Sequence, residues 1–473
     1  MFLKRGLVFF KPEELIEHSI DPKDCFLILK TQRPGGKMIQ KKLSFALKAK
    51  KYYGLPKGYI EAKIPERVLK SRLVDCTTDG LPIPEKVKFR GSLLKRLRQD
   101  EAVRNTVRKL LLSPTKSTTL CLPCGWGKTA CALAVTKLIG RRTFVLVHTK
   151  VLANQWISRI HQFLPEAKCA ILSGSTSPPP QDIDICVGLM QSVAKISESS
   201  QMSNRFSTFG FVIVDEAHHC PCDSIRKSLL CFGARFSLGL TATPYRADGL
   251  TNYIEWSLGK CALCIPPRFE SCGVVQVDFK QTRPTSKAES ILYGISNSLV
   301  DVLAANEERN EKIVNIGIEA SKTHKCGVLV VTSRRAHAEA LYDAFRGKIG
   351  DSFVALLMGG VEKGACIEEN VDMDLLCDTP HVIVSTIQMV CEGFDRGNTL
   401  RILVLASPRS HSDESTWLCQ TVGRICRAGA KDDSTKGQRS IVFDIVDAGM
   451  NSTKQMARQR QIGYKKFGIE KIS

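Results

Sequence analysis

The residues best suited to chemistry begin at positions 122–129, which read Leu-Pro-Cys-Gly-Trp-Gly-Lys-Thr. They follow an apolar run expected to be a strand (Thr119–Leu122) and precede an apolar segment expected to be a helix (Ala130–Leu138). Glycines let backbone N–H groups close around phosphates, and a helix N-terminus adds positive potential. The context therefore predicts a phosphate-binding P-loop. Its expected nucleotide contacts are Pro123, Cys124, Gly125, Trp126, Gly127, Lys128 and Thr129.

In such a loop Lys128 reaches the β- and γ-phosphates, and Thr129 holds Mg²⁺ through its hydroxyl. A second candidate, Asp215-Glu216-Ala-His218, directly follows the apolar run 211–214. An acidic residue at the end of a strand, in a sheet that also carries a P-loop, is placed to order Mg²⁺. We expect Asp215 to order Mg²⁺ and Glu216 to polarise the water that attacks the γ-phosphate.

The elements that must position these residues are short apolar runs rich in Val and Ile. They are Thr143–His148, Phe211–Asp215, Val328–Thr332, Val382–Thr386 and Ile402–Ala406. Because the runs do not alternate with polar residues, we expect strands buried on both faces, in parallel sheets covered by helices. The runs form two groups, before about residue 260 and after about residue 325, with a helical segment around Asn306–Glu319 between them. Two α/β domains are therefore predicted.

The predicted boundaries divide the 473 residues into five parts. They are a basic N-terminal accessory domain (1–92), a first α/β domain (93–264), a linker (265–310), a second α/β domain (311–450) and a basic, helical tail (451–473). Gly and Pro punctuation and high Lys content set residues 1–92 apart, and we expect a mixed α/β or β-rich fold there.

The charge balance favours a polyanionic partner. Lys+Arg 68 against Asp+Glu 47 gives a net charge of +21, which points to nucleic acid, an anionic membrane or an anionic substrate. Lysines at 37, 41, 42, 48, 50 and 51 lie next to Tyr52 and Tyr53. This cluster fits either a duplex-engaging surface or a solvated face.

Membrane insertion and secretion are not expected. No run approaches the roughly 18 apolar residues of a membrane span, and too few apolar residues follow the first basic pair for a signal peptide. The 19 cysteines are scattered, with several in apolar strands, which indicates a reducing intracellular compartment, cytoplasmic or nuclear. A zinc site at the spacings Cys121/Cys124 or Cys261/Cys264 would need four converging ligands, so buried free thiols are the alternative.

In their order, these motifs resemble those of superfamily 2 helicases and translocases with a DEAH-box-like second motif. The segment Leu238–Gly249 is similar to motif III of the XPB/UvsW-like branch. The helicases of large cytoplasmic DNA viruses, poxvirus- and iridovirus-like, are the group it most resembles. The resemblance covers about 93–450 and implies two tandem RecA-like domains, ATP and Mg²⁺ as cofactors, and nucleic acid as partner.

The resemblance also implies roles for residues of the first domain. Gln99 would read the adenine edge, although Arg98 and Leu97 replace the usual aromatic residue and proline before it. Thr149, Lys150 and Gln191 would contact nucleic acid. The residues expected to couple hydrolysis to domain closure are His218, Thr241 and Thr243.

In the second domain the resemblance places Arg334 and Thr386 on nucleic acid, and Gly393 and Asp395 on the nucleotide. The stretch 420–427 matches Q-x-x-G-R-x-x-R and supplies Gln420, Arg424 and Arg427 as catalytic residues. Two arginines three apart share one face of a helix. We expect their guanidinium groups to stabilise the transition-state charge from the second domain, so that hydrolysis requires closure.

These observations predict an ATP-dependent DNA helicase or translocase, with 3′ to 5′ polarity and a role in viral transcription or DNA repair implied by the resemblance. For a viral protein the compartment would be the host cytoplasm or the virion. Three alternatives stay open. An RNA helicase could use the same motifs, a silent nucleic-acid-binding subunit would need only the basic surface, and a restriction-enzyme motor would need a nuclease module that the sequence does not show.

Overall fold

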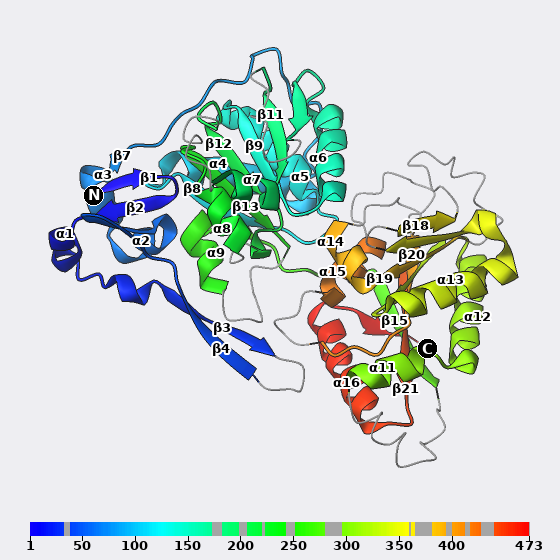
Figure 1. Cartoon of the computed structure of the whole chain (residues 1–473). Coiled ribbons are helices and arrows are strands. Elements are labelled where there is room, and N and C mark those ends of the chain that lie inside the picture. The colour runs from blue at the N-terminus through cyan, green and yellow to red at the C-terminus, as the bar shows by residue number, and fades with distance from the viewer. Residues whose placement is uncertain are drawn as a thin grey trace. The chain divides into compact units, whose positions relative to one another are not determined.

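The computed structural model describes residues 1–32, 38–172, 182–197, 206–219, 223–242, 251–279, 296–358, 361–364, 381–393, 400–411, 417–426 and 439–472. The chain forms two compact units, unit 1 (Met1–Pro266) and unit 2 (Pro267–Ser473). Each contains one large sheet covered by helices (Figure 1). Within the described ranges no helix is both long and apolar enough to cross a membrane.

The main sheet of unit 1 has seven parallel strands in the order β10-β11-β9-β12-β13-β8-β14. The strands are β8 (Ser117–Cys121), β9 (Thr143–Val147), β10 (Cys169–Ile171), β11 (Ile185–Leu189), β12 (Phe211–Val214), β13 (Phe236–Thr241) and β14 (Cys261–Cys264). One core packs them against α4 (Gln99–Leu112), α5 (Lys128–Ile139) and α6 (Lys150–Phe163). A second core packs the other face against α7 (Met190–Ser197), α8 (Asp223–Leu229) and α9 (Thr251–Leu258).

The sheet of unit 2 has eight strands in the order β18-β17-β19-β16-β20-β21-β15-β22, and all but β18 run parallel. The strands are β15 (Cys272–Phe279), β16 (Gly327–Thr332), β17 (Val354–Met358), β18 (Val361–Gly364), β19 (Val382–Thr386), β20 (Leu400–Leu405), β21 (Ser440–Asp447) and β22 (Glu470–Lys471). The helices are α11 (Ser296–Ala304), α12 (Glu307–His324), α13 (Arg335–Ile349), α14 (Ile387–Gly393), α15 (Trp417–Ile425) and α16 (Asn451–Lys466). The predicted pair of parallel α/β domains is confirmed.

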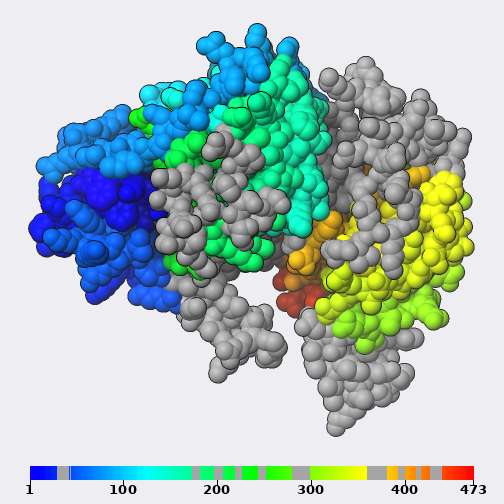
Figure 2. All heavy atoms as spheres, turned by 45° about the horizontal axis from the view of Figure 1, so that its top comes forward, coloured from blue at the N-terminus to red at the C-terminus, as the bar shows by residue number. Residues whose placement is uncertain are grey.

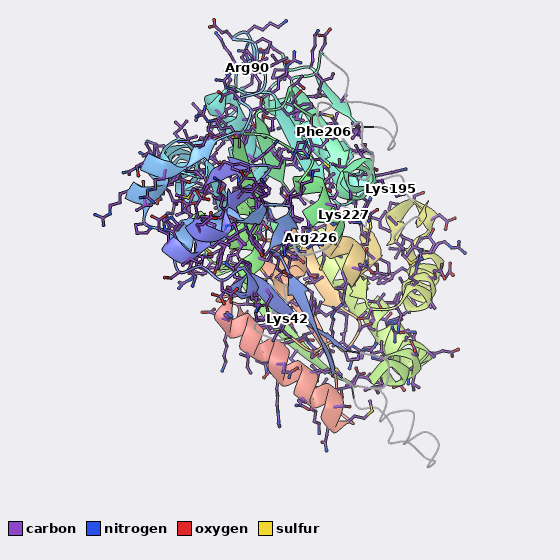
Figure 3. The ribbon with its side chains drawn as sticks, turned by 60° about the vertical axis from the view of Figure 1, so that its left-hand side comes forward. Lys42, Arg90, Lys195, Phe206, Arg226 and Lys227 are labelled. Carbon is purple, nitrogen blue, oxygen red and sulfur yellow. The ribbon has the colours of Figure 1, made fainter. Side chains whose placement is uncertain are left out.

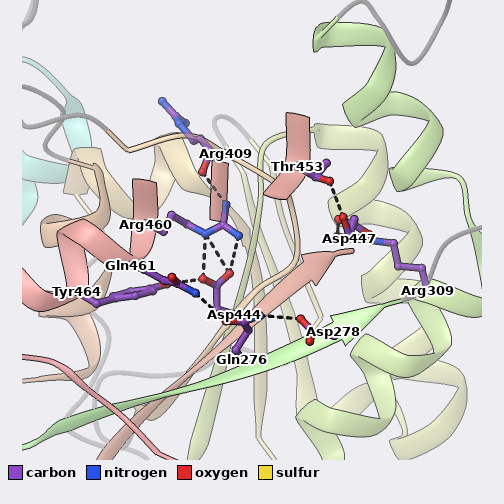
Figure 4. Close-up of polar contacts among 10 residues, drawn as sticks. All are labelled: Gln276, Asp278, Arg309, Arg409, Asp444, Asp447, Thr453, Arg460, Gln461 and Tyr464. Carbon is purple, nitrogen blue, oxygen red and sulfur yellow. Dashed lines mark hydrogen bonds and ion pairs between the residues drawn. The ribbon is translucent and has the colours of Figure 1, made fainter. Parts of the chain in front are cut away.

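Two segments expected outside the second domain are built into it. Strand β15 falls in the predicted linker, yet all eight of its residues pair with β21, from Cys272 opposite Ser440 to Phe279 opposite Asp447. Helix α16 falls in the predicted basic tail, yet it buries Arg460 and Tyr464. The Arg460 guanidinium donates to the Asp444 carboxylate at 2.8 to 3.0 Å (Figure 4). Asp444 lies on β21, so this ion pair binds α16 to the sheet of unit 2. The predicted basic tail therefore has a structural role that its charge alone did not indicate.

A second buried ion pair fixes α12 to the end of β21. The Arg309 guanidinium contacts both oxygens of Asp447 at 2.7 and 3.1 Å (Figure 4). Helix α12 begins after Asn306, whose side chain caps it by accepting from the Arg309 N–H at 2.8 Å. The predicted helix in this region is present, and its first turn supplies the arginine.

The N-terminal residues form a five-stranded sheet, a hairpin and three short helices. The sheet has the order β5-β6-β2-β1-β7, and the hairpin is β3 with β4. The bounds are β1 (Phe2–Lys4), β2 (Leu7–Phe10), β3 (Phe26–Gln32), β4 (Met38–Ser44), β5 (Leu47–Ala49), β6 (Tyr52–Pro56), β7 (Val74–Asp75), α1 (Pro12–Glu17), α2 (Lys57–Lys63) and α3 (Glu66–Arg72). Short 3₁₀ turns cover Pro22–Asp24, Lys95–Leu97, Ala217–His219 and Asp351–Phe353.

This N-terminal part packs on the first α/β domain within one compact unit, as the blue and green segments of Figures 1 and 2 show. The Phe45 ring stacks on Tyr253 with centroids 3.8 Å apart. The Lys57 ammonium donates to the Ser237 hydroxyl at 2.6 Å. A Cβ at Gly58 would lie 2.0 Å from the Glu255 carbonyl oxygen, so only glycine permits this approach of α2 to α9.

Candidate functional site

The P-loop connects the carboxyl end of β8 to the N-terminus of α5, as predicted. Gly125 and Gly127 have φ values of 77° and 76°, which glycine adopts without steric cost. Gly127 caps α5, so the first N–H groups of a twelve-residue helix face the loop. Lys128 is the first residue of that helix, and its Nζ donates to the Leu122 carbonyl at 3.3 Å. The loop thus has the backbone shape and the charge that a phosphate site requires.

Gln99, the first residue of α4, contacts the P-loop through its side chain. Its side chain is 5% exposed. The amide oxygen accepts from the Leu94 N–H at 2.8 Å, and the amide nitrogen donates to the Trp126 carbonyl at 2.9 Å. A Cβ at position 127 would lie 2.6 Å from that nitrogen. Gln99 therefore positions the P-loop backbone, and its contact with adenine stays a prediction.

Asp215 and Glu216 follow β12 at the same edge of the sheet. The Asp215 carboxylate is buried, accepting from the Trp156 indole N–H at 2.8 Å and from the Glu216 N–H at 2.9 Å. Burial and the neighbouring Glu216 charge raise the pKa of Asp215 to about 6, against the lowering effects of Trp156 and Lys128. Two adjacent carboxylates here would be stabilised by a cation.

Glu216 adopts a left-handed backbone conformation with a φ of 48°. For a residue with a Cβ this conformation costs about 1–2 kcal/mol. Strain of this kind persists where the surrounding structure fixes it, and it concentrates at functional sites. The outlier coincides with the residue predicted to polarise the attacking water.

His218 connects this acidic segment to the end of β13. Its Nδ1 lies 3.3 Å from the Thr241 hydroxyl and 3.3 Å from Glu216 Oε2. Thr241 is fully buried as the last residue of β13. His218 therefore connects Glu216 to the end of β13, and the role of His218 and Thr241 in coupling stays a prediction. Thr243 lies outside the described residues.

The residues predicted to contact nucleic acid in unit 1 follow strands of the same sheet. Thr149 caps α6 after β9, and its hydroxyl accepts from the Leu152 N–H at 3.3 Å. Lys150 is exposed as the first residue of α6, and Gln191 is exposed at the start of α7, after β11. Strands β9 and β11 are parallel neighbours, so these three residues lie along one edge.

In unit 2, Arg424 of α15 binds the end of α14. Its Nε donates to the Val390 carbonyl at 3.0 Å and its Nη2 to the Cys391 carbonyl at 3.3 Å. Arginine is favourable at such a site because the last carbonyls of a helix carry negative potential. Gln420 is buried on the same helix. Helix α15 ends at Ile425, so the expected placement of both arginines on one helix face stays a prediction.

Arg427 and Asp395 lie outside the described residues, and Gly393 is the last residue of α14. Thr386 ends β19, and its hydroxyl accepts from the Met389 N–H at 3.4 Å. Arg334 caps α13, and its Nε pairs with Asp301 at 2.7 Å. The contacts found for Thr386 and Arg334 are thus internal to unit 2, and their expected contacts with nucleic acid stay predictions.

Trp156 holds Asp215 through its indole N–H, a role that the sequence did not indicate. Its apolar neighbours on α6, Leu152, Ala153 and Ile160, follow the spacing of a buried helix face and could have indicated that it is buried. No local pattern indicates its partner, which lies 59 residues away.

A magnesium ion fits the donors at this site. Among the described residues, no group of three or more His, Cys, Asp or Glu side chains could hold a metal. A P-loop does not require such a cage, because Mg²⁺ there keeps waters and phosphate oxygens beside one carboxylate and one hydroxyl. Asp215 offers a buried carboxylate with a raised pKa, and Thr129 follows Lys128 at the helix start.

Several known proteins resemble this chain in sequence. A family model for the type III restriction enzyme res subunit matches residues 93–246. QP509L of African swine fever virus, named as a candidate ATP-dependent RNA helicase, is 26% identical over 397 residues, covering 78% of this chain and 72% of the relative. Helicase 109L of Invertebrate iridescent virus 3, also a candidate by its name, is 34% identical over 156 residues, covering 32% and 47%.

Two solved structures share the fold. S. cerevisiae Dbp5 bound to RNA and ADP BeF3 has a TM-score of 0.50 at 15% identity, covering 79% of this chain and 88% of its own. The type ISP restriction-modification enzyme LlaBIII bound to DNA has a TM-score of 0.53 at 15% identity, covering 81% and 30%.

Proposed function

We propose that this chain, a superfamily 2 helicase and hence an ATP-hydrolysing enzyme that acts on nucleic acid, couples hydrolysis to movement along DNA or to its unwinding. One observation carries the proposal. The P-loop after β8, the Asp215–Glu216 pair after β12 and Thr241 at the end of β13 occupy the carboxyl edge of three neighbouring parallel strands. This arrangement supports a site in which phosphate binding, water activation and coupling act together.

Each residue of the proposed site has a distinct task. Lys128 and the N–H groups of the P-loop bind the phosphates. Thr129 and Asp215 would hold Mg²⁺, which neutralises charge on the phosphate oxygens when bound. Glu216 accepts a proton from the attacking water, held there by its strained backbone and by His218.

Unit 2 is proposed to supply the remaining groups. Gly393 and Asp395 would contact the nucleotide, while Gln420, Arg424 and Arg427 stabilise the transition-state charge. The two hydrogen bonds from Arg424 to carbonyl groups of α14 support this role, because they fix the orientation of the guanidinium group without neutralising its charge. Hydrolysis would then require both units.

Nucleic acid is proposed to follow the edge marked by Thr149, Lys150 and Gln191, with the N-terminal basic residues as a second contact. In Figure 3, Lys195, Lys227, Arg226 and Lys42 follow one another across unit 1. The Arg226 guanidinium reaches from α8 to the Ser44 carbonyl at 3.2 Å, at the end of the hairpin. Such a surface would attract phosphates without reading sequence.

The motifs have the XPB/UvsW-like form, which favours DNA as the substrate. The relative QP509L is named for RNA helicase activity, which favours RNA instead. A place in viral transcription or DNA repair, in the cytoplasm of an infected cell, is proposed from the viral relatives. The free cysteines among the described residues fit a reducing compartment.

Steady-state ATP hydrolysis by the full chain tests this proposal, measured alone and with single-stranded or duplex DNA or RNA. We expect stimulation by DNA. Glu216→Gln should lower turnover by about 10²–10⁴-fold, the usual contribution of a general base, and strengthen nucleic-acid binding in the presence of ATP. The matched control is Glu85→Gln, at an exposed glutamate, which should leave turnover unchanged.

The outcomes separate the candidates. Stimulation by RNA alone would replace DNA with RNA as the substrate. Hydrolysis unchanged in Glu216→Gln would refute the assigned role of Glu216. Absence of turnover with every polymer would favour the silent binding subunit over the helicase motor.

A further inference from the structure

Three cysteines converge on one face of the sheet, directly before the P-loop. Cys261 and Cys264 are three residues apart on β14, so a regular strand would place them on opposite faces. The pairing with β8 shifts between them, with Cys261 opposite Thr119, Leu263 opposite Leu120, and Cys264 opposite Cys121. Thr119 and Cys121 are two apart and share a face. The bulge therefore turns Cys261 and Cys264 to that face as well.

The sulfurs of this cluster contact one another. The Cys261 thiol donates to the Leu263 carbonyl at 3.0 Å and the Cys121 thiol to the Ala242 carbonyl at 3.7 Å, and both thiols are neighbours of Cys264. Cys264 is exposed, Cys261 is half-buried and Cys121 is buried. The exposed Cys264 is thus a neighbour of two less exposed cysteines, Cys121 and Cys261.

This arrangement favours the thiolate of Cys264. Hydrogen bonds from Cys121 and Cys261 lower the pKa of Cys264 to about 3, against the raising effect of partial burial. The pKa values of Cys121 and Cys261 are correspondingly raised well above the usual range. A thiolate is the nucleophilic form of cysteine, and Cys264 is exposed to solutes on β14.

Among the described cysteines, Cys121 has the most suitable position to close a disulfide with Cys264. Residues opposite each other on adjacent strands lie about 5 Å apart, within the span of roughly 4.4–6.8 Å between the Cα atoms of a disulfide. Because of the bulge, Cys261 lies opposite Thr119, two residues or about 7 Å along the strand from the level of Cys264 and thus at the limit of that span. Cys121, opposite Cys264, is therefore the partner.

We propose that Cys264 is a peroxide-reactive site that forms a disulfide with Cys121. The Cys264 thiolate attacks one oxygen of hydrogen peroxide, and the O–O bond breaks to give a sulfenic acid and hydroxide. The Cys121 thiol then displaces the sulfenic hydroxyl, forming the S–S bond and releasing water. The two sulfurs together lose two electrons, which reduce the peroxide.

The bond would form at the base of the nucleotide loop. Cys121 ends β8, and the next residue, Leu122, accepts the Lys128 hydrogen bond through its carbonyl and donates to the Thr241 carbonyl at 3.1 Å. A link from Cys121 to β14 would therefore constrain the strand that carries the loop. This consequence for ATP turnover rests on the proposed function, whereas the chemistry at Cys264 does not.

The test treats the reduced full chain with hydrogen peroxide and maps the products by mass spectrometry. We expect a reducible crosslink between the peptides of Cys121 and Cys264, 2 Da lighter than their sum. Cys264→Ser should abolish it. Cys121→Ser should instead leave a sulfenic acid at Cys264 that dimedone traps. Alkylation of Cys264 by iodoacetamide at pH 6 should be faster than alkylation of the exposed Cys76.

The exposed Cys76 serves as the internal comparison. If Cys264 is alkylated no faster than Cys76 at pH 6, or if no Cys121–Cys264 crosslink forms, the proposal is refuted. Zinc bound at one ion per chain through the three thiols would also refute it, in favour of a metal site. Failure of ATP hydrolysis in the reduced protein would count against the proposed function alone.

Discussion

At the scale of single residues, the carboxylate of Asp215 is buried beside a second carboxylate, Glu216. Burial disfavours a charged group, so its position must be stabilised by specific donors. The Trp156 indole and a backbone N–H supply them, each within 3 Å. The side chain that orders the carboxylate is thus an aromatic residue from α6, whose contact with Asp215 the sequence did not indicate.

Trp156→Phe should lower kcat/KM for ATP by at least about tenfold, because a hydrogen bond to a charged group contributes about 1.5–3 kcal/mol. The measurement is steady-state hydrolysis beside thermal unfolding. Ile160→Val, on the buried face of the same helix, calibrates the effect of lost packing. Equal activity in Trp156→Phe and Ile160→Val at matched stability would contradict the positioning role.

At the scale of elements, the N-terminal sheet joins the first α/β domain through α2. Its first residue, Lys57, is 4% exposed and donates to Ser237 on β13. Burial lowers the pKa of Lys57 to about 8, which the charges of Glu61 and Asp75 offset in part. Burying the Lys57 ammonium with one hydrogen-bond partner makes the free energy of folding less favourable. Contacts around it, such as the stacking of Phe45 on Tyr253, must contribute more than this cost.

Lys57→Met should therefore stabilise unit 1 at pH 7. Below pH 8 the lysine is charged in both the folded and unfolded states, and the lowering from 10.5 to about 8 represents roughly 3 kcal/mol at 1.36 kcal/mol per unit. Loss of the Ser237 hydrogen bond removes about 1 kcal/mol of this gain. Between pH 8 and 10.5 the unfolded state binds more protons, so the stability of the wild type rises with pH.

The gain in the free energy of unfolding of Lys57→Met over the wild type should therefore decrease between pH 8 and 10.5. Above pH 10.5 it should vanish. Urea unfolding of the full chain at pH 7 and pH 10.5 measures the difference. Lys86→Met, at an exposed lysine, should stay within about 0.5 kcal/mol of the wild type at both values. A pH-independent effect of Lys57→Met would show that burial does not set its charge.

At the scale of the whole molecule, each unit closes its own core. In unit 2 the closing element is α16, which follows the last long strand and returns to it through Arg460 and Asp444. The Tyr464 hydroxyl donates to the same carboxylate at 3.1 Å, and Arg460 also donates to the Arg409 carbonyl at 2.7 Å (Figure 4). A segment read as a basic tail is therefore a structural part of unit 2.

Arg460→Met should destabilise unit 2 by about 3–5 kcal/mol, because it leaves the Asp444 charge buried without a partner. Arg458→Met is the matched control, since Arg458 is exposed on the same helix, and it should change stability by less than about 0.5 kcal/mol. Urea unfolding followed by circular dichroism gives both values. If the two variants unfold at the same urea concentration, the buried pair does not hold α16.

The sequence by itself determined what depends on near neighbours. Strand β19 matches the run expected at 382–386, α12 begins after Asn306, and the P-loop connects β8 to α5. Apolar periodicity, helix caps and glycine positions are local, so they can be read along the chain. Only the tertiary structure decided the partners across the chain. Trp156 meets Asp215, Lys57 meets Ser237, and Cys264 meets Cys121. Such pairs depend on strand order and register, which the spacing of residues along the chain does not contain.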